Sequence, residues 1–295
     1  MAKEARSLAG RVVAITGGAR GIGEATARAF VQKGAKVAIG DLDVELAQKT
    51  AGVLGGETIA LQLDVTDRDS FASFVSQVEE RLGPVDVLVN NAGIMPIGPF
   101  VEETDETALR MIDINLHGVI FGCKLVMSGM MRRRSGHIVN VASQAGKGGF
   151  PGGATYCATK HAVVGLSEAI RAELRDYEVE VSCVMPAVVN TELGSGLVEA
   201  RGVKVSEPSD VADAIVEAVE RPKFDVWVPK STAAIARVMT LMPRRGREAI
   251  ARALKADQVL WNADPKARAA YEDRAAHSEP GLEPTEAEAE KVKSS

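Results

Sequence analysis

The sequence has few cysteines and no obvious long hydrophobic run, and each of these absences argues against a class of protein. Its three cysteines, Cys123, Cys157 and Cys183, are odd in number and far apart, which favours small core residues over a disulfide framework. The first ten residues contain Lys3, Glu4 and Arg6 and no apolar run, and we see no stretch that approaches the roughly 18 apolar residues of a membrane span. We therefore expect a cytoplasmic protein that is neither secreted nor membrane-spanning.

The sequence also has no excess of positive charge and no clusters of metal-ligand residues. The formal net charge is −5, which removes a general electrostatic reason to bind nucleic acid. None of the four histidines (117, 137, 161 and 277) is spaced with another His, Cys or Glu in a metal-binding motif. His161 follows Lys160 but points in another direction on the expected helix, so we read it as structural or surface-exposed. We expect no nucleic-acid partner and no catalytic metal.

Short β-branched runs are present, and they alternate with longer helical patterns. The seven runs are 12–16, 36–40, 58–63, 85–90, 137–141, 181–185 and 224–228. They are apolar almost throughout, as in strands that are buried on both faces of a parallel sheet. The sequence therefore predicts an α/β fold, a Rossmann-type doubly wound parallel sheet of seven strands, in a single domain over residues 1–228.

After Val228 the pattern becomes helical, and residues 229–276 are expected to form a C-terminal helical extension. Its expected breaks are Pro243, Gly246 and Pro265. An apolar stripe precedes a basic cluster: Ile235, Val238, Met239 and Met242, then Arg244, Arg245 and Arg247. Such a helix with a basic end is read as a lid or subunit contact, a weak peripheral membrane contact through 235–247, or an outer helix on the core. Residues 277–295 contain few apolar side chains and are expected to be a disordered acidic tail.

A glycine-rich turn joins the first expected strand to a helix. Residues 16–23 read TGGARGIG, with Gly17, Gly21 and Gly23 suited to a tight turn, a close backbone approach and a close helix contact. A phosphate placed there would meet free N–H groups at the positive end of the helix. A plain strand-to-helix turn is the alternative, but this context favours nucleotide binding.

Asp41 ends the second expected strand, 24 residues after Gly17. An acidic side chain there can accept hydrogen bonds from the adenosine ribose, which favours NAD. Arg20 favours NADP instead, because a guanidinium can pair with its extra phosphate. Leu42 adds no second cation, and that phosphate would face the Asp41 carboxylate. We therefore expect NAD as the cofactor.

Two further strand ends are expected to border the nucleotide. Asp64, followed by Val65, either bonds the adenine amino group or is the N-cap of the helix after Thr66. Residues 90–93, NNAG, line the cofactor through their backbone or form a plain turn at the end of the strand.

Taken in order, these motifs resemble the short-chain dehydrogenase/reductase family, in its NAD-preferring form. The resemblance rests on 16–23, 90–93, Asn115, Ser143 and the run 156–160, YCATK, and covers roughly residues 8–228. It implies the strand order 3-2-1-4-5-6-7, with the nucleotide across the carboxyl ends of the strands. It also implies a homo-oligomer, a dimer or a tetramer.

Tyr156 is the expected proton-transfer residue. A free tyrosine titrates near pH 10, so acting as a base near neutrality needs a shift of about 3 units, or about 4 kcal/mol. Lys160 lies one helical turn further on, and its cation, together with an oxidised nicotinamide, favours the phenolate. The resemblance implies that Lys160 also holds the nicotinamide ribose, that Ser143 bonds the substrate oxygen and that Asn115 anchors a water behind the lysine. The alternative is an amphipathic tyrosine and a solvated lysine on a helix surface.

The segment 185–191 follows the sixth expected strand and resembles the family's Pro-Gly segment. The resemblance assigns Thr191 to the nicotinamide carboxamide. Ala187 stands where the family has glycine, and its methyl group would crowd the nicotinamide or narrow the pocket.

The expected site therefore has two parts. The cofactor contacts are Gly17, Arg20, Gly21, Ile22, Gly23, Asp41, Leu42, Asp64, Val65, Asn91, Ala92, Gly93, Tyr156, Lys160, Pro186, Val189 and Thr191. The substrate pocket is Met95, Gln144, Ala145, Phe150, Val188, Leu193 and Leu197.

This mostly apolar pocket, without an arginine clamp, suits a hydrophobic secondary alcohol or ketone, of steroid, lipid or terpenoid type. The expected function is an oxidoreductase that transfers a hydride between NAD(H) and such a substrate. The rival functions are an NADPH-dependent carbonyl reductase and a non-catalytic dinucleotide-binding scaffold. The intact set Ser143, Tyr156 and Lys160 argues against the scaffold.

Overall fold

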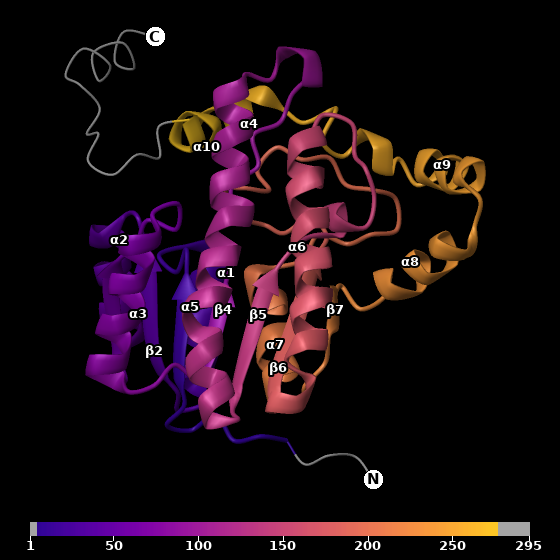
Figure 1. The fold of residues 1–295 in the computed structure, drawn as a ribbon. Coiled ribbons are helices and arrows are strands. Elements are labelled where there is room, and N and C mark those ends of the chain that lie inside the picture. The colour runs from indigo at the N-terminus through magenta and orange to yellow at the C-terminus, as the bar shows by residue number, and fades with distance from the viewer. Residues whose placement is uncertain (1–4, 277–295) are drawn as a thin grey trace, which may run out of the picture.

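Residues 5–276, which the computed structural model describes, contain seven strands in one parallel sheet (Figure 1). The strands are β1 Val12–Thr16, β2 Lys36–Asp41, β3 Thr58–Gln62, β4 Val87–Asn90, β5 Gly136–Val141, β6 Val179–Pro186 and β7 Asp225–Val228. Their order is β3-β2-β1-β4-β5-β6-β7, and every neighbouring pair is parallel. The predicted fold class and strand order are confirmed.

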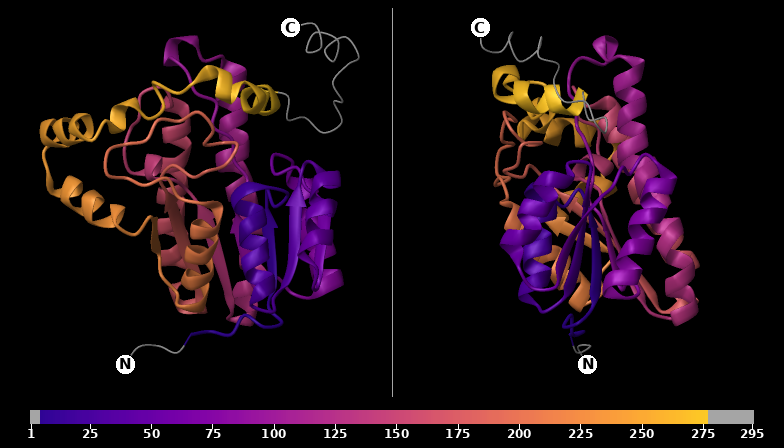
Figure 2. Two further views of the ribbon diagram at one scale, coloured as in Figure 1. Left: turned by 180° about the vertical axis from the view of Figure 1, so that it is seen from behind. Right: turned by 90° about the vertical axis from the view of Figure 1, so that its left-hand side faces the viewer.

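Helices cover both faces of the sheet, which Figure 2 shows edge-on between them. They are α1 Gly21–Gln32, α2 Val44–Leu54, α3 Arg68–Leu82, α4 Asp105–Ile112, α5 Gly118–Arg133, α6 Ala154–Glu173 and α7 Pro208–Glu220. Helix α1 packs against α7 on one face, and α3 packs against α5 on the other.

The apolar strands follow from this layering, because successive side chains enter different cores. In β1, Ala14 belongs to the core that contains Phe71 of α3, whereas Ile15 belongs to the core that contains Phe30 of α1. All three cysteines are free and buried, as the sequence predicts.

The helical run Asp105–Arg133 is long and apolar enough to cross a membrane, with a mean hydropathy of 1.3 in its most apolar window. The sequence analysis overlooked this run. It consists of α4, a π-helical turn at Asp113–His117 and α5. Helix α5 contacts β4, β5 and α3, and it contributes Val119 and Val126 to the core. Packing against the sheet therefore explains its apolar character.

The C-terminal extension contains α8 Thr232–Leu241, α9 Arg244–Ala253 and α10 Pro265–Ala276. Pro243 and Pro265 mark breaks as predicted, but Gly246 lies inside α9, where one glycine costs only about 1 kcal/mol relative to alanine. The single amphipathic helix with a basic end is also wrong. Pro243 separates the apolar stripe on α8 from the arginines on α9, because proline disfavours a helical conformation in the preceding residue.

Helices α8 and α9 run along one side of the molecule, and α10 returns across the carboxyl ends of the strands (Figure 2). The acidic tail predicted for 277–295 lies outside the described residues.

Candidate active site

A cleft of about 2380 Å³ opens at the carboxyl ends of the strands. It contains the predicted cofactor residues except Gly23, the predicted substrate residues, and Ser143, Tyr156 and Lys160. Gly23 and Asn115 lie beside the cleft and do not line it. Segments far apart in the sequence are thus brought together as the sequence predicts.

The glycine turn has the geometry of a phosphate cradle. Gly17 and Gly21 adopt φ values of +63° and +57°, in the left-handed region that favours glycine. A Cβ on Gly23 would lie 2.0 Å from the carbonyl oxygen of Gly17, so only glycine fits where α1 leaves the turn. Within residues 5–276 no side chain caps the start of α1 at Arg20. The N–H groups of its first turn therefore stay available for an anion.

Asn91 braces this turn, a role that the sequence analysis did not identify. Its Nδ2 donates to the carbonyl oxygens of Thr16 and Gly17, both at 2.9 Å. The N–H groups of Asn91 and Ala92 donate to the hydroxyl of Thr16 at 3.0 Å. The ends of β1 and β4 are therefore fixed to each other, and Ala92 and Gly93 line the cleft.

Asp41 lines the cleft and is held by two backbone groups. Its carboxylate accepts hydrogen bonds from the N–H groups of Ala19, at 3.0 Å, and Asp43, at 3.1 Å. Burial raises the pKa of this carboxyl, and the two backbone bonds oppose that rise. The two backbone donors therefore fix the position of the carboxylate.

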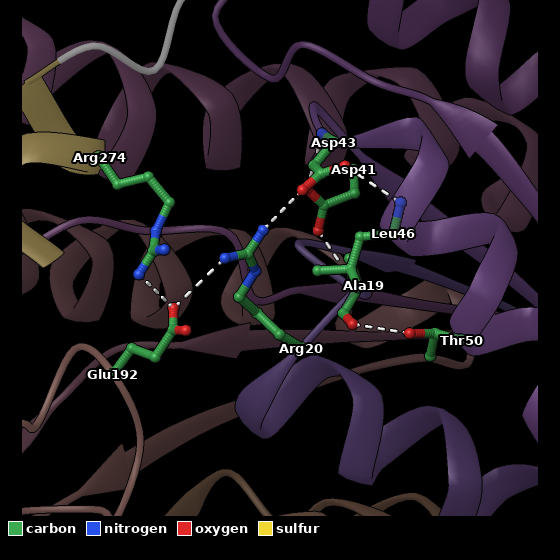
Figure 3. A network of polar contacts seen from close by, with 8 residues as sticks. All are labelled: Ala19, Arg20, Asp41, Asp43, Leu46, Thr50, Glu192 and Arg274. Carbon is green, nitrogen blue, oxygen red and sulfur yellow. Dashed lines mark hydrogen bonds and ion pairs between the residues drawn. The ribbon is translucent and has the colours of Figure 1, made fainter. Parts of the chain in front are cut away.

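Arg20 is paired with two carboxylates (Figure 3). Its guanidinium lies 2.8 Å from Asp43 and 3.3 Å from Glu192. Glu192 also lies 2.8 Å from Arg274 of α10, so a chain of charges links the extension to the nucleotide turn. Asp43 and Glu192 were missed from the sequence. Asp43 caps α2 by accepting from the N–H of Leu46, and that capping position was the only local signal.

Asp64 is not a helix N-cap. Its Oδ1 accepts hydrogen bonds from the N–H and the hydroxyl of Thr66, at 2.8 and 2.7 Å. Helix α3 is capped by Asp67 instead, because the helix begins one residue after Asp67 and four after Asp64. Asp64 and Val65 line the cleft, so their contact with adenine stays a prediction.

Tyr156 and Lys160 lie on the first turns of α6 and are 6% and 5% exposed. The alternative of a surface tyrosine with a solvated lysine is therefore wrong. Lys160 Nζ lies 5.7 Å from the centre of the Tyr156 ring and donates to the carbonyl of Val141 at 3.0 Å. Ser143 follows β5, where its Oγ accepts from the N–H of Ala145 at 3.1 Å. The three side chains meet within one cleft.

Burial dominates the titration of this set. It raises the pKa of Tyr156 to about 12, although a hydrogen bond with Ser143 opposes the rise. It also lowers the pKa of Lys160 to about 8. The side chains alone therefore favour a neutral phenol. Further stabilisation of a phenolate has to come from another cation in the cleft, such as an oxidised nicotinamide ring.

Asn115 lies behind Lys160, in the π-helical turn between α4 and α5. It is fully buried, accepts from the N–H of Ile94 and donates to the carbonyl of Ile94, both at 2.8 Å. A Cβ on Gly93 would lie 3.1 Å from Asn115 Oδ1 and 3.5 Å from Lys160 Nζ. The π-helical turn places Asn115 beside the lysine, and its water-anchoring role stays a prediction.

Thr191 and Gly21 meet across the cleft, since a Cβ on Gly21 would lie 3.5 Å from the Thr191 methyl group. The Thr191 hydroxyl accepts from the N–H of Gly194 at 3.2 Å. Pro186 ends β6, and Ala187 and Val189 line the cleft. The loop after β6 therefore starts at the nucleotide turn, and the contact of Thr191 with the carboxamide stays a prediction.

Six of the seven predicted pocket residues pack in one apolar cluster with Tyr156: Met95, Ala145, Phe150, Val188, Leu193 and Leu197. Gln144 differs, because its amide donates to the carbonyl of Val228 and to the hydroxyl of Thr232 at the start of α8. Val259 and Leu260 of the extension complete the cluster. The sequence analysis missed them because no motif marks them.

Helix α10 holds the loop that follows β6. Arg268 is 1% exposed, and its guanidinium donates to the carbonyls of Leu193, Ser195 and Met95 at 2.9, 3.0 and 2.8 Å. It also pairs with Glu272 at 2.8 Å. A buried cation satisfied in this way fixes the substrate side of the cleft to the extension.

His161 lines the cleft but is exposed, and its Nδ1 lies 2.8 Å from the carbonyl oxygen of Cys157. Over residues 5–276 no group of three His, Cys, Asp or Glu side chains is arranged to hold a metal ion.

Comparisons with known proteins find dehydrogenases that are similar to this chain in sequence. The sequence is 41% identical over 191 residues to a sorbitol dehydrogenase of Cereibacter sphaeroides, covering 64% of this chain and 75% of that protein. It is 40% identical over 183 residues to a galactitol 2-dehydrogenase of Agrobacterium fabrum, covering 62% and 72%.

A short chain dehydrogenase/reductase of Burkholderia phymatum, solved in complex with NAD, is similar in structure. Its TM-score is 0.73 and its identity 27%, over 80% of this chain and 94% of that one. The sequence profile described as short chain dehydrogenase matches residues 11–202, so α8, α9 and α10 lie beyond the match. The chain belongs to the short chain dehydrogenase family of oxidoreductases.

Proposed function

We propose that this protein is an NAD-dependent dehydrogenase that moves a hydride between NAD(H) and a hydrophobic secondary alcohol or ketone. The observation that carries the proposal is the presence of Ser143 and the buried pair Tyr156 and Lys160 in the cleft that also contains the glycine turn. The dehydrogenases named among the relatives support an alcohol as the reacting group.

Each side chain has one task in this reaction. When bound, the cofactor supplies the hydride acceptor or donor and, in its oxidised form, a positive charge. During alcohol oxidation, Tyr156 takes the hydroxyl proton, and it returns a proton to the carbonyl oxygen in the reverse direction. Ser143 hydrogen-bonds that oxygen beside the phenol. The Lys160 ammonium, 5.7 Å from the Tyr156 ring, favours the phenolate.

NAD is preferred to NADP for electrostatic reasons. The 2′-phosphate of NADP would approach Asp41 and Asp43, and bringing like charges together is unfavourable. Arg20 offers no free cation there, because Asp43 and Glu192 already bind its guanidinium. A neighbour solved with NAD supports the same choice. An NADPH-dependent carbonyl reductase would need Arg20 to leave both carboxylates.

The substrate is hydrophobic because apolar side chains surround Tyr156. Phe150, Leu193 and Leu197, which lie within the family match, pack in the same cluster as Tyr156. Val259 and Leu260 of the extension belong to that cluster too. The relatives named for sorbitol and galactitol act on polar polyols. Since part of the wall lies beyond the family match, we favour a steroid-, lipid- or terpenoid-like skeleton for this chain.

A fluorescence titration with NADH and NADPH, followed by turnover of cyclic alcohols and ketones, tests the proposal. We expect tighter binding of NADH and oxidation of hydrophobic secondary alcohols. Tyr156→Phe should lower kcat at least a thousand-fold and leave NADH affinity within about two-fold, because only the proton-transferring oxygen is removed.

Tyr177→Phe is the matched control, because Tyr177 is 38% exposed outside the cleft. Most of the activity surviving in Tyr156→Phe would contradict the catalytic assignment. Tight nucleotide binding without turnover of any alcohol or ketone would favour the non-catalytic scaffold instead.

A further inference from the structure

Tyr271 reaches the active-site cleft from α10, beyond the part of the chain that the family profile matches. Its phenol oxygen accepts a hydrogen bond from the N–H of Met95 at 2.7 Å. Met95 belongs to the apolar cluster around Tyr156. The Tyr271 hydroxyl therefore lies at the substrate side of the cleft and not at the nucleotide side.

Among residues 5–276, the bond from Met95 is the only hydrogen bond of this hydroxyl, and in it the oxygen accepts. The proton of the hydroxyl therefore has no acceptor there. A tyrosine hydroxyl can donate one hydrogen bond while it accepts another. Burial raises the pKa of Tyr271 above its ordinary value, although the Met95 hydrogen bond and the Arg268 charge oppose the rise, and negative charges on Glu272 and Tyr156 add to it. The group therefore keeps its proton during catalysis and can donate it to a ligand.

Arg268 holds Tyr271 in place. The guanidinium lies 4.9 Å from the centre of the Tyr271 ring and is anchored by the carbonyls of Leu193, Ser195 and Met95. The Met95 backbone is thus bound twice, by Arg268 through its carbonyl and by Tyr271 through its N–H. A donor fixed in this way discriminates between ligands because it loses little freedom on binding.

We propose that Tyr271 determines specificity by donating a hydrogen bond to a second oxygen of the substrate, so that the enzyme selects alcohols and ketones with another hydroxyl, ether or carbonyl oxygen. The inference rests on the proposed function and narrows its substrate class to hydrophobic skeletons with two oxygens. A substrate with one oxygen would leave this donor without a partner beside the apolar cluster around Tyr156, which is unfavourable.

The test compares ring alcohols that differ only by the second oxygen. Cyclohexanol and 2-decalol are each measured against their diols, with NAD, in the full-length protein. We expect wild-type kcat/KM to be about ten-fold or more higher for at least one diol than for its parent alcohol. In Tyr271→Phe this ratio should fall to about one, because the diol loses the hydrogen bond that distinguishes it from the parent alcohol. In Tyr177→Phe, the same change on the surface, the ratio should persist.

Two results would overturn the inference alone: a wild type that oxidises the parent alcohols as well as every diol, or a Tyr271→Phe protein in which both classes slow equally. The second result is what a purely structural tyrosine would give. A wild type that binds NADH but oxidises none of these alcohols would overturn the proposed function, and this inference with it.

Discussion

At the residue scale, the hydrogen bonds of Asp41 and the ion pairs of Arg20 determine which of the two charges is available to a nucleotide. The sequence places both beside the nucleotide, but it leaves open whether the carboxylate or the guanidinium dominates. The structure gives Asp41 two backbone donors and gives Arg20 two carboxylate partners. Arg20 is thereby neutralised, and Asp41 keeps its place in the cleft.

Replacing Asp41 with alanine and Leu42 with arginine together should shift the cofactor preference toward NADPH. The double variant removes one negative charge from the ribose end of the cleft and adds a cation beside it. We expect the ratio of the Kd values for NADPH and NADH to fall by about ten- to a hundred-fold. The measurement is a fluorescence titration, with Leu42→Arg alone as the control. An unchanged ratio would show that Asp41 lies away from the ribose.

The pH dependence of alcohol oxidation should follow Tyr156 and Lys160. Oxidation needs the deprotonated Tyr156, whose pKa burial raises to about 12, so kcat/KM should increase as the pH rises from 6. Lys160, whose pKa burial lowers to about 8, loses its charge as the pH rises further. With it the phenolate loses a stabilising cation, so the increase should stop near pH 8.

Carbonyl reduction needs the protonated Tyr156 and should not increase over the same interval. Initial rates in both directions between pH 6 and 10 make the comparison. A flat oxidation profile would contradict proton transfer by a group that burial keeps protonated.

At the element scale, sequence reasoning worked where a motif is local and failed where the contacts are distant. The strand ends, the glycine turn and the two residues on α6 all lie within short patterns, and the structure brings them together. Helix α10 has no apolar stripe from which its contacts could be predicted, since its buried residues are Arg268 and Ala275. Arg268 binds carbonyls more than 70 positions away. No local pattern predicts such a pairing.

Replacing Arg268 with methionine should loosen the substrate side of the cleft. The change keeps most of the side-chain volume but leaves three carbonyls without a donor, which costs about 1–3 kcal/mol for each group that stays buried. We expect a lower Tm, faster proteolysis of the loop 191–206 and a raised KM for the alcohol, with NADH affinity within about two-fold.

Arg274→Met is the control, because Arg274 is also on α10 but binds only the exposed Glu192 among the described residues. It should change these quantities much less. Equal losses in the two variants would mean that Arg268 is not the main anchor of the loop.

At the scale of the whole molecule, the predicted fold class, strand order and family were confirmed. The family could be predicted because its motifs are short and occur in order along the chain, and the resemblance to the family implied the strand order. The path of the extension was not predictable. Pro243 separates α8 from α9. This break divides one expected helix into two, and α8 is left with exposed apolar side chains. Val238 and Leu241 on α8 are 56% and 88% exposed. Another subunit and a membrane surface are the two alternative partners for α8.

We expect the purified protein to be a dimer or a tetramer, with a mass two or four times that of the 31.2 kDa chain. If α8 is part of the subunit contact, Leu241→Glu should lower that mass, because a charge there cannot be buried without a partner. Light scattering after size exclusion measures both. Val53→Glu, at another exposed site, is the control. A wild-type monomer that floats with anionic vesicles would favour the membrane surface.

The position of α10 also bears on how such an enzyme could acquire a new substrate. The glycine turn, Ser143, Tyr156 and Lys160 all lie within the family match, whereas Val259, Leu260, Arg268 and Tyr271 lie in the last third of the chain, beyond it. The groups proposed to react and part of the surface proposed to recognise the substrate are thus encoded by separate stretches of the gene. Recombination or mutation confined to the second stretch would exchange one wall of the cleft and leave the hydride and proton chemistry as it was.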